Sequence, residues 1–368
     1  MSEERLARAA LSRVVEPGDR GVHTLLQQWG PTETFGRIKA GHGRLARFAE
    51  RVRRLDTDRD LATAAKVGAR LVIPGDDEWP ARLDDLDVPP WCLWVRGPAD
   101  LGAVTRRSVA VVGSRVCTSY GEQFAAELAA EVAGRGWTVV SGAAFGIDGA
   151  AHRGALSVDG VTVAVLAGGV DRAYPAGHSR LIERIAETGS VLAEVAPGSA
   201  PMRSRFLLRN RLIAAMSKGT VVVEADVRSG SLNTMKTAFE LGRPVGAVPG
   251  PVTSMTSAGC HAKIRAGMAV LVTSAAEVVD LVGDLGSDAC EEPRAVTLPT
   301  DELGPDEARV HEGLPHRDWA DLTQVAVVSA LAPMQAMAAL GRLVELGLAE
   351  RRDGSWRKAR PRRKESSA

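Results

Sequence analysis

The residues most able to do chemistry lie in a glycine-rich stretch, S-G-A-A-F-G-I-D-G-A-A-H, at positions 141–152. An apolar run ends at Val140 and a helical pattern begins at Ile147, so we expect a strand, a tight turn and a helix start. Gly142 and Gly146 allow backbone angles that a Cβ would forbid. Such a turn leaves N–H groups unpaired at the positive end of a helix, which suits an anion such as phosphate.

Asp148 and His152 stand four residues apart and therefore share one face of that helix. They could serve a site at the turn. Equally, Asp148 could cap the helix while His152 is a satisfied core histidine. The sequence leaves both interpretations open.

A second candidate is the arginine-rich stretch at 203–211, which contains no acidic residue. Its arginines are Arg203, Arg205, Arg209 and Arg211, with Phe206 and Asn210 between them. Cations for phosphates and an aromatic ring for a base are the combination that binds a single strand. The alternative is the N-terminal region of a helix, with Phe206 in the core and the arginines paired to distant acids. We favour binding.

Apolar, β-branched runs alternating with helical patterns predict the elements that position these residues. The runs are 109–112, 138–140, 161–166, 190–194, 220–224, 245–248 and 269–272. Continuous apolar strands separated by helices predict an α/β fold, a Rossmann-like parallel sheet with helices on both faces. In such sheets ligands bind beyond the carboxyl ends of the strands.

Five of the predicted strands end in turns of small residues, hydroxyls or arginine. They include Gly113-Ser114-Arg115, the Ser141–Gly146 turn, Gly168-Gly169 and Ser229-Gly230-Ser231. One such turn is weak evidence, but several on one edge predict a groove that accepts phosphates.

Bulk composition excludes few classes of partner. The chain carries 46 basic and 45 acidic residues, for a formal net charge of +1. Its four cysteines show no CxxC spacing, so we expect no metal, no redox pair and no cofactor. Scattered thiols without a signal peptide suggest the cytoplasm, and no apolar run approaches the length of a membrane span.

Changes of composition divide the chain into six segments. Residues 1–70 read as a small helical domain with a basic rim, for which a solvated helix face is the main alternative to nucleic-acid contact. Residues 71–107 read as a connector packed on the core at 108–283, although its aromatics could also stack bases. An acidic linker at 284–307 precedes a winged-helix pattern at 308–359 and a basic, disordered tail at 360–368. The third helix of the winged-helix pattern is mainly apolar. Both protein binding and DNA binding therefore stay open as roles for this helix.

With these motifs assembled, the chain resembles the DprA/Smf family of bacterial DNA processing proteins. The matching motifs are V-A-V-V-G-S-R at 109–115, the stretch at 141–156, V-L-A-G-G-V-D-R-A-Y-P at 165–175, R-N-R-L-I-A at 209–214, V-V-E-A-D-V-R-S-G-S-L at 222–232 and A-V-P-G at 247–250. The match is close over 108–283, and the flanks follow the family's layout, with a SAM- or HhH-like helical domain and a winged helix.

The resemblance implies a single-stranded DNA-binding protein, not an enzyme, that protects incoming DNA in natural transformation and passes it to the RecA recombinase, usually as a homodimer. Arg115 then resembles a phosphate-contacting arginine, and 206–211 resembles the family's F-x-x-R-N-R stretch. The candidate DNA-binding residues are Gly113, Ser114, Arg115, Ser141, Gly142, Gly146, Ile147, Asp148, Gly168, Gly169, Arg205, Phe206, Arg209, Asn210, Arg211, Ser229, Gly230, Ser231 and Lys263. Leu207, Met235 and His261 depart from the family pattern.

Two other functions fit the same fold class. LOG-type phosphoribohydrolases share this Rossmann variant, but their carboxylates close to the glycine motif have no counterpart between Arg228 and Phe239. Glu224 is the one spare carboxylate at a predicted strand end. A nucleotide-sensing module is the other alternative, against which the arginine stretch and the winged-helix pattern argue.

Overall fold

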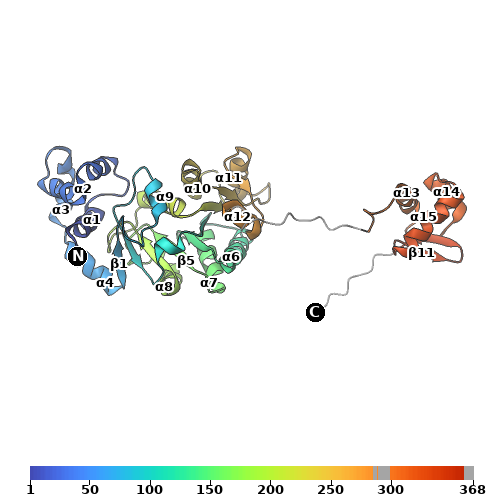
Figure 1. The fold of residues 1–368 in the computed structure, drawn as a ribbon, viewed down its shortest axis with the longest axis horizontal. Coiled ribbons are helices and arrows are strands. Elements are labelled where there is room, and N and C mark those ends of the chain that lie inside the picture. Colours follow the sequence, from blue (N-terminus) through green and yellow to red (C-terminus); the bar gives the residue numbers. More distant parts are fainter. Residues whose placement is uncertain (285–287, 289–298, 360–368) are drawn as a thin grey trace. The chain divides into compact units, whose positions relative to one another are not determined.

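The structure is a computed structural model that describes residues 1–284, 288 and 299–359. The chain divides into two compact units, Met1–Cys290 and Glu291–Ala368, and each is described by itself. Figure 1 shows the first unit in blue to orange and the second in orange to red.

The first unit is built on one nine-stranded sheet in the order β1-β2-β6-β5-β4-β3-β7-β8-β9. The strands are β1 (Ala69–Val72), β2 (Leu93–Arg96), β3 (Ser108–Val112), β4 (Thr138–Ser141), β5 (Thr162–Leu166), β6 (Ser190–Ala193), β7 (Gly219–Val222), β8 (Val245–Ala247) and β9 (Val270–Leu271). Strands β3 to β9 pair in parallel, at the positions of the seven predicted runs. The predicted Rossmann-like fold is therefore confirmed.

Helices cover both faces of the sheet because successive strand residues point to opposite sides. Ala110 and Val112 pack with α9 and α10, whereas Val109 and Val111 pack with α6 and α7. The helices of the sheet region are α5 (Leu101–Val104), α6 (Ser119–Gly134), α7 (Ile147–Ser157), α8 (Ser179–Thr188), α9 (Arg203–Met216), α10 (Ser231–Glu240), α11 (Met255–Arg265) and α12 (Ala275–Val282), with 3-10 turns η2 (Ala81–Asp85) and η3 (Ala176–His178).

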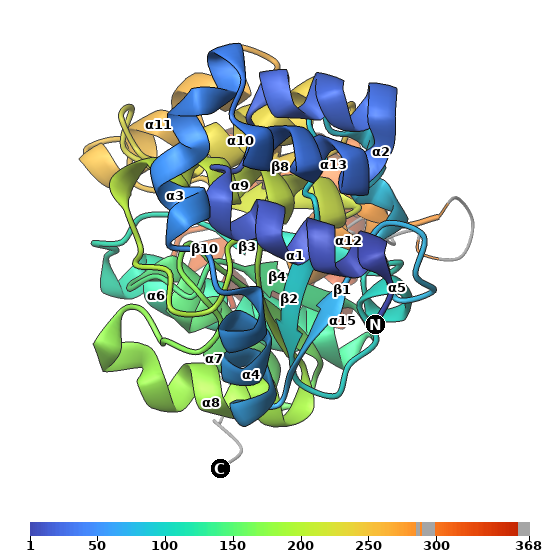
Figure 2. The same ribbon diagram turned by 90° about the vertical axis from the view of Figure 1, so that its left-hand side faces the viewer.

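The N-terminal helices lie at the β1 end of the sheet, where they face the viewer in Figure 2. They are α1 (Glu3–Val14), α2 (Arg20–Ala40), α3 (Ala49–Arg53) and α4 (Thr57–Lys66), with the 3-10 turn η1 (Gly43–Phe48). Helix α2 is kinked at Gly30, whose φ is 72°, directly before Pro31.

The segment predicted as a connector, 71–107, also contributes to the sheet. Strand β1 crosses the boundary predicted at residue 70, and β2 pairs antiparallel with both β1 and β6. Trp91 and Trp94 are buried, which removes them as rings for stacking bases.

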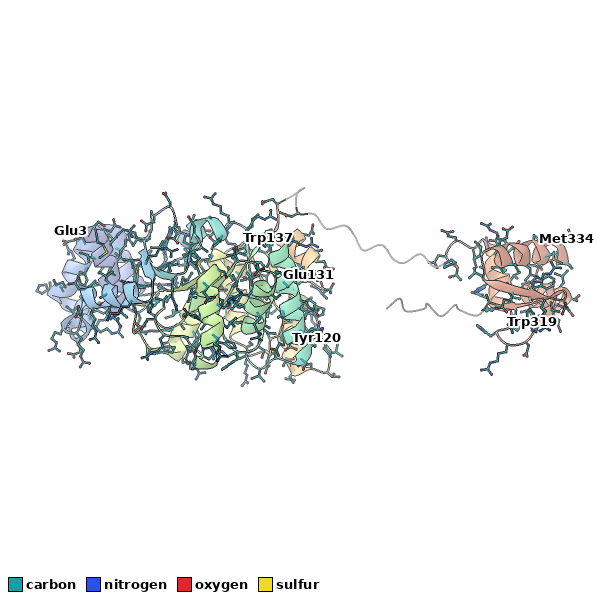
Figure 3. The ribbon with its side chains drawn as sticks, turned by 90° about the horizontal axis from the view of Figure 1, so that it is seen from below. Glu3, Tyr120, Glu131, Trp137, Trp319 and Met334 are labelled. Carbon is teal, nitrogen blue, oxygen red and sulfur yellow. The ribbon has the colours of Figure 1, made fainter. Side chains whose placement is uncertain are left out.

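The second unit contains α13 (Pro305–Gly313), β10 (Ala320–Asp321), α14 (Leu322–Ser329), α15 (Pro333–Glu345), β11 (Ala349–Arg352) and β12 (Ser355–Lys358). Helix α13 begins at Pro305, inside the segment predicted as the acidic linker, whereas α14, α15 and the hairpin of β11 and β12 lie within the predicted 308–359. Figure 3 labels Trp319 and Met334 on this unit. The winged-helix assignment stays a prediction. Most of the predicted acidic linker and the whole predicted tail at 360–368 lie outside the described residues.

Within the described residues, no helix alone has the length and apolarity of a membrane span. The pair α14 and α15, bent by 100° at its break, reaches that threshold on length and composition only.

Candidate nucleic-acid interface at the carboxyl edge of the sheet

The chain reverses its direction across the sheet between β3 and β7, which are parallel neighbours although β4 to β6 come between them in sequence. The connections after these strands leave in opposite directions, which opens a crevice beyond their carboxyl ends. A cavity of about 460 Å³ lies there. It is lined by Val112, Gly113, Ser114, Arg115, Val116, Ala144, Asp148, Arg203, Phe206, Leu207, Arg209, Asn210, Ile213, Arg228, Ser229, Gly230, Ser231 and Thr234.

Two glycines bring the turn after β4 against the turn after β3. A Cβ on Gly146, whose φ is 74°, would lie 2.3 Å from the carbonyl oxygen of Ser114. A Cβ on Gly113 would lie 2.6 Å from Ile147. The amide of Ile147 also donates to the Ser114 carbonyl oxygen, at 3.2 Å. Gly113 and Gly146 therefore permit the close approach that forms one wall of the cavity.

A buried polar cluster fixes the floor of the cavity. The Arg209 guanidinium donates to the carbonyl oxygens of Gly142, at 2.8 Å, and of Val165, and its Nε donates to the Asn210 side chain. Asn210 in turn donates to the Gly230 carbonyl oxygen at 3.2 Å. These bonds tie the turns after β4 and β7 to helix α9.

Burial shifts the pKa values of two residues in this cluster. It lowers the pKa of Arg209 to about 10, which leaves the guanidinium charged at neutral pH. Burial also raises the pKa of Asp148, although the charge of Arg209 opposes that shift. Asp148, in the first turn of α7, accepts a 3.4 Å hydrogen bond from the Ala144 amide in the preceding turn. The N-cap of α7 is Gly146 and no side chain of the described residues caps the helix there, so Asp148 holds the turn and is not the predicted cap.

Three exposed arginines surround the opening: Arg115 after β3, Arg203 at the start of α9 and Arg228 after β7. None forms an ion pair with any carboxylate in the part of the chain that the structure describes. Arg115 lies over Phe206, with 4.7 Å between its Cζ and the ring centroid. The cavity therefore presents three cations that have no salt-bridge partner among the described residues, an arrangement that favours an anionic ligand.

The other arginines of the predicted stretch have internal partners. Arg205 donates two hydrogen bonds of 2.9 Å to Glu16. Arg211 pairs with Glu194 at 2.6 Å, and the Glu194 side chain is only 5% exposed. The pairing to distant acids that the sequence analysis considered therefore holds for Arg205 and Arg211. Phe206 is half-buried between Arg115 and the Tyr174 ring, so it is neither a core residue nor a freely exposed ring.

Several predicted residues stand outside the cavity lining. Ser141 is buried and donates to the Val111 carbonyl oxygen at 2.6 Å. Gly168 and Gly169 pack against the loop that contains Ser199, and Lys263 on α11 approaches the Met268 sulfur at 3.7 Å. Gly142, Gly146 and Ile147 shape the wall without lining the cavity.

Arg203, which belongs to the predicted arginine-rich stretch, lines the cavity. The structure adds lining residues outside the predicted list of DNA-binding residues, chiefly Arg228 and Ala144. Each adjoins a predicted motif in sequence, so proximity to a strand-end turn is the signal that could have found them.

The possible catalytic residues have structural roles. His152 is fully buried, its Nδ1 lies 2.7 Å from the Thr162 hydroxyl, and burial lowers its pKa to about 3. It is a neutral core histidine. Glu224 is also buried and accepts hydrogen bonds from the Thr118 amide, at 2.9 Å, and from the Thr118 and Thr256 hydroxyls. It lies outside the lining of the cavity.

Comparison with known proteins identifies the family of the chain. The family model of DNA recombination-mediator protein A matches residues 70–283. The chain belongs to this family. It is 48% identical to a putative DNA processing protein DprA of Mycobacterium tuberculosis, over 95% of this chain and 93% of that protein. It is 41% identical to DprA of Streptococcus pneumoniae, over 55% of this chain and 71% of that protein.

Solved structures of the family show the same fold. The X-ray structure of Streptococcus pneumoniae DprA matches with a TM-score of 0.65 and 32% identity, covering 77% of this chain and 99% of that one. A Helicobacter pylori DprA structure, described for its single-stranded DNA binding mode, matches with a TM-score of 0.52 and 28% identity. That match covers 57% of this chain and 93% of the other. The family matches thus include the strands and turns that form the cavity.

Proposed function

We propose that the protein binds single-stranded DNA at the cavity beyond β3 and β7. The observation that carries the proposal is the set of exposed arginines, Arg115, Arg203 and Arg228, which lack acidic partners among the described residues. Phosphate contacts from such arginines position a strand without reading its sequence. The single-stranded DNA binding of the Helicobacter pylori relative supports the same assignment.

The proposed role is that of a recombination mediator. The protein protects incoming DNA during natural transformation and loads RecA onto it, in the cytoplasm and as a homodimer. The family description supports the mediator role. Nucleation of RecA filaments on single strands, with and without the protein, tests the loading step, and sedimentation velocity tests the dimer.

One titration separates this function from the alternatives. Fluorescence anisotropy with labelled oligo-dT should report binding that neither duplex DNA nor a nucleoside monophosphate displaces efficiently. A nucleotide-sensing module would instead bind the monophosphate and ignore the oligonucleotide.

We also propose that the protein is not a phosphoribohydrolase. Glu224 is engaged by Thr118 and Thr256, and Asp148, the carboxylate among the lining residues, is buried beside Arg209. Incubation with adenosine monophosphate should release no adenine above the blank. Sustained release that Glu224→Gln abolishes would overturn this assignment.

A further inference from the structure

Two ring pairs involve residues of the cavity lining or their chain neighbours: Phe206 lines the cavity, and Phe145 follows the lining residue Ala144. Tyr174 contacts Phe206, with ring centroids 5.5 Å apart. Phe145 meets His178 edge to face, with centroids 4.7 Å apart and ring planes 66° apart. Tyr174 and His178 both belong to the segment between β5 and α8, so one segment carries a ring from each pair.

These rings adjoin the Arg115 turn from two directions. Phe206 lies under the Arg115 guanidinium, 4.7 Å from its Cζ. On the other side, Phe145 directly precedes Gly146, which packs against the Ser114 carbonyl oxygen. Phe145 is thus linked to the Arg115 turn through its neighbour Gly146, and Phe206 is linked to it through the Arg115 side chain.

Phe145 and Tyr174 are 50% and 45% exposed. Phe145 is nevertheless fixed in place, because His178 Nδ1 bonds to the Ala143 carbonyl oxygen at 3.0 Å and Gly177 leaves room for the ring. A Cβ on Gly177 would lie 3.1 Å from the Phe145 ring. The position of this ring is thus set before any ligand arrives, which limits the entropy lost on binding.

We propose that Phe145, together with Tyr174, is a platform on which a nucleobase stacks after the strand leaves the arginine-lined cavity. The inference rests on the function proposed above. The ligand is a base of single-stranded nucleic acid, because Tyr174 contacts Phe206, whose ring lies under the Arg115 guanidinium. Rings close to a cation that takes the phosphate are the combination that single-strand binding uses. Stacking tolerates any base, since every base has a π-face.

Matched substitutions test the platform in the full chain. Phe145→Ala should weaken binding to oligo-dT of about 20 nucleotides by roughly fivefold to a hundredfold, the range expected for one stacked base. Phe145→Leu, which keeps apolar bulk, should weaken it comparably, and both variants should leave the affinity for an abasic strand of equal length unchanged. Phe239→Ala is the control, because Phe239 on α10 is 48% exposed but does not line the cavity.

A direct readout uses Phe145→Trp and Phe239→Trp. Oligo-dT should quench the added fluorescence at 145 and leave that at 239 unchanged. Equal binding of wild type and Phe145→Ala, or no quenching at 145 while the oligonucleotide is bound, would overturn the platform. If the wild-type protein does not bind oligo-dT at all, the proposed function itself is refuted.

Discussion

At the scale of the residue, the arginines of one sequence stretch divide between binding and support. Arg211 is a support residue, because its partner Glu194 is almost fully buried. Arg211→Met should lower the free energy of unfolding by about 3–5 kcal/mol, since an uncompensated carboxylate then remains buried. Urea unfolding measures the loss, and Arg211→Met with Glu194→Gln should recover part of it. If Arg211→Met leaves the stability unchanged and weakens oligo-dT binding, Arg211 contacts the DNA instead.

Arg115 is the clearest binding residue, and its removal should affect all strands alike. Arg115→Ala should weaken binding to oligonucleotides of every base composition by about tenfold to a hundredfold, the loss of a charged hydrogen bond. Arg106→Ala is the control, because Arg106 is exposed just before β3, at the end of that strand away from the cavity. A change in base preference would show that Arg115 reads bases.

At the scale of the element, Glu16 joins the segment between α1 and α2 to the start of α9. Hydrogen bonding to Arg205 lowers the pKa of Glu16 below its ordinary 4.5, with Arg51 adding to the shift. A lowered folded-state pKa stabilises the protein above the unfolded pKa, and that stability is lost as pH falls through the folded value. The melting temperature of wild type should therefore exceed that of Glu16→Gln near pH 7, and the difference should shrink as pH falls below 4.5. A difference that stays constant with pH would show that the pair contributes no charge-dependent stability.

Most of the parallel sheet was predictable because each central strand is a short apolar run between helical patterns. Strands β1 and β2 were not, since Trp91 and Trp94 in a proline-rich segment resemble a packed connector. The cavity turns after β3, β4 and β7 were predictable from their glycines and hydroxyls. The pairing of Arg205 was not, because Glu16 lies 189 residues away and only the fold brings the two together.

At the scale of the whole molecule, a formal net charge of +1 hides a local excess of cations at the cavity. Three phosphate contacts by Arg115, Arg203 and Arg228 would release counterions, and each contact with a single strand contributes about −0.7 to the slope of log affinity against log salt. We therefore expect a slope of about −2 for oligo-dT. Replacing the three arginines with alanine should bring the slope close to zero.

The same measurement tests whether the basic rim of the N-terminal helices shares in binding. Arg44, Arg53 and Arg54 are exposed there, and Arg53 and Arg54 already pair with Glu50. Because paired cations release few counterions, replacing Arg53 and Arg54 with alanine should leave the slope unchanged. If the wild-type slope is steeper than about −2 and the rim substitutions reduce it, the strand also contacts the N-terminal helices. A slope that is flat for the wild type would remove phosphate contact as the basis of binding.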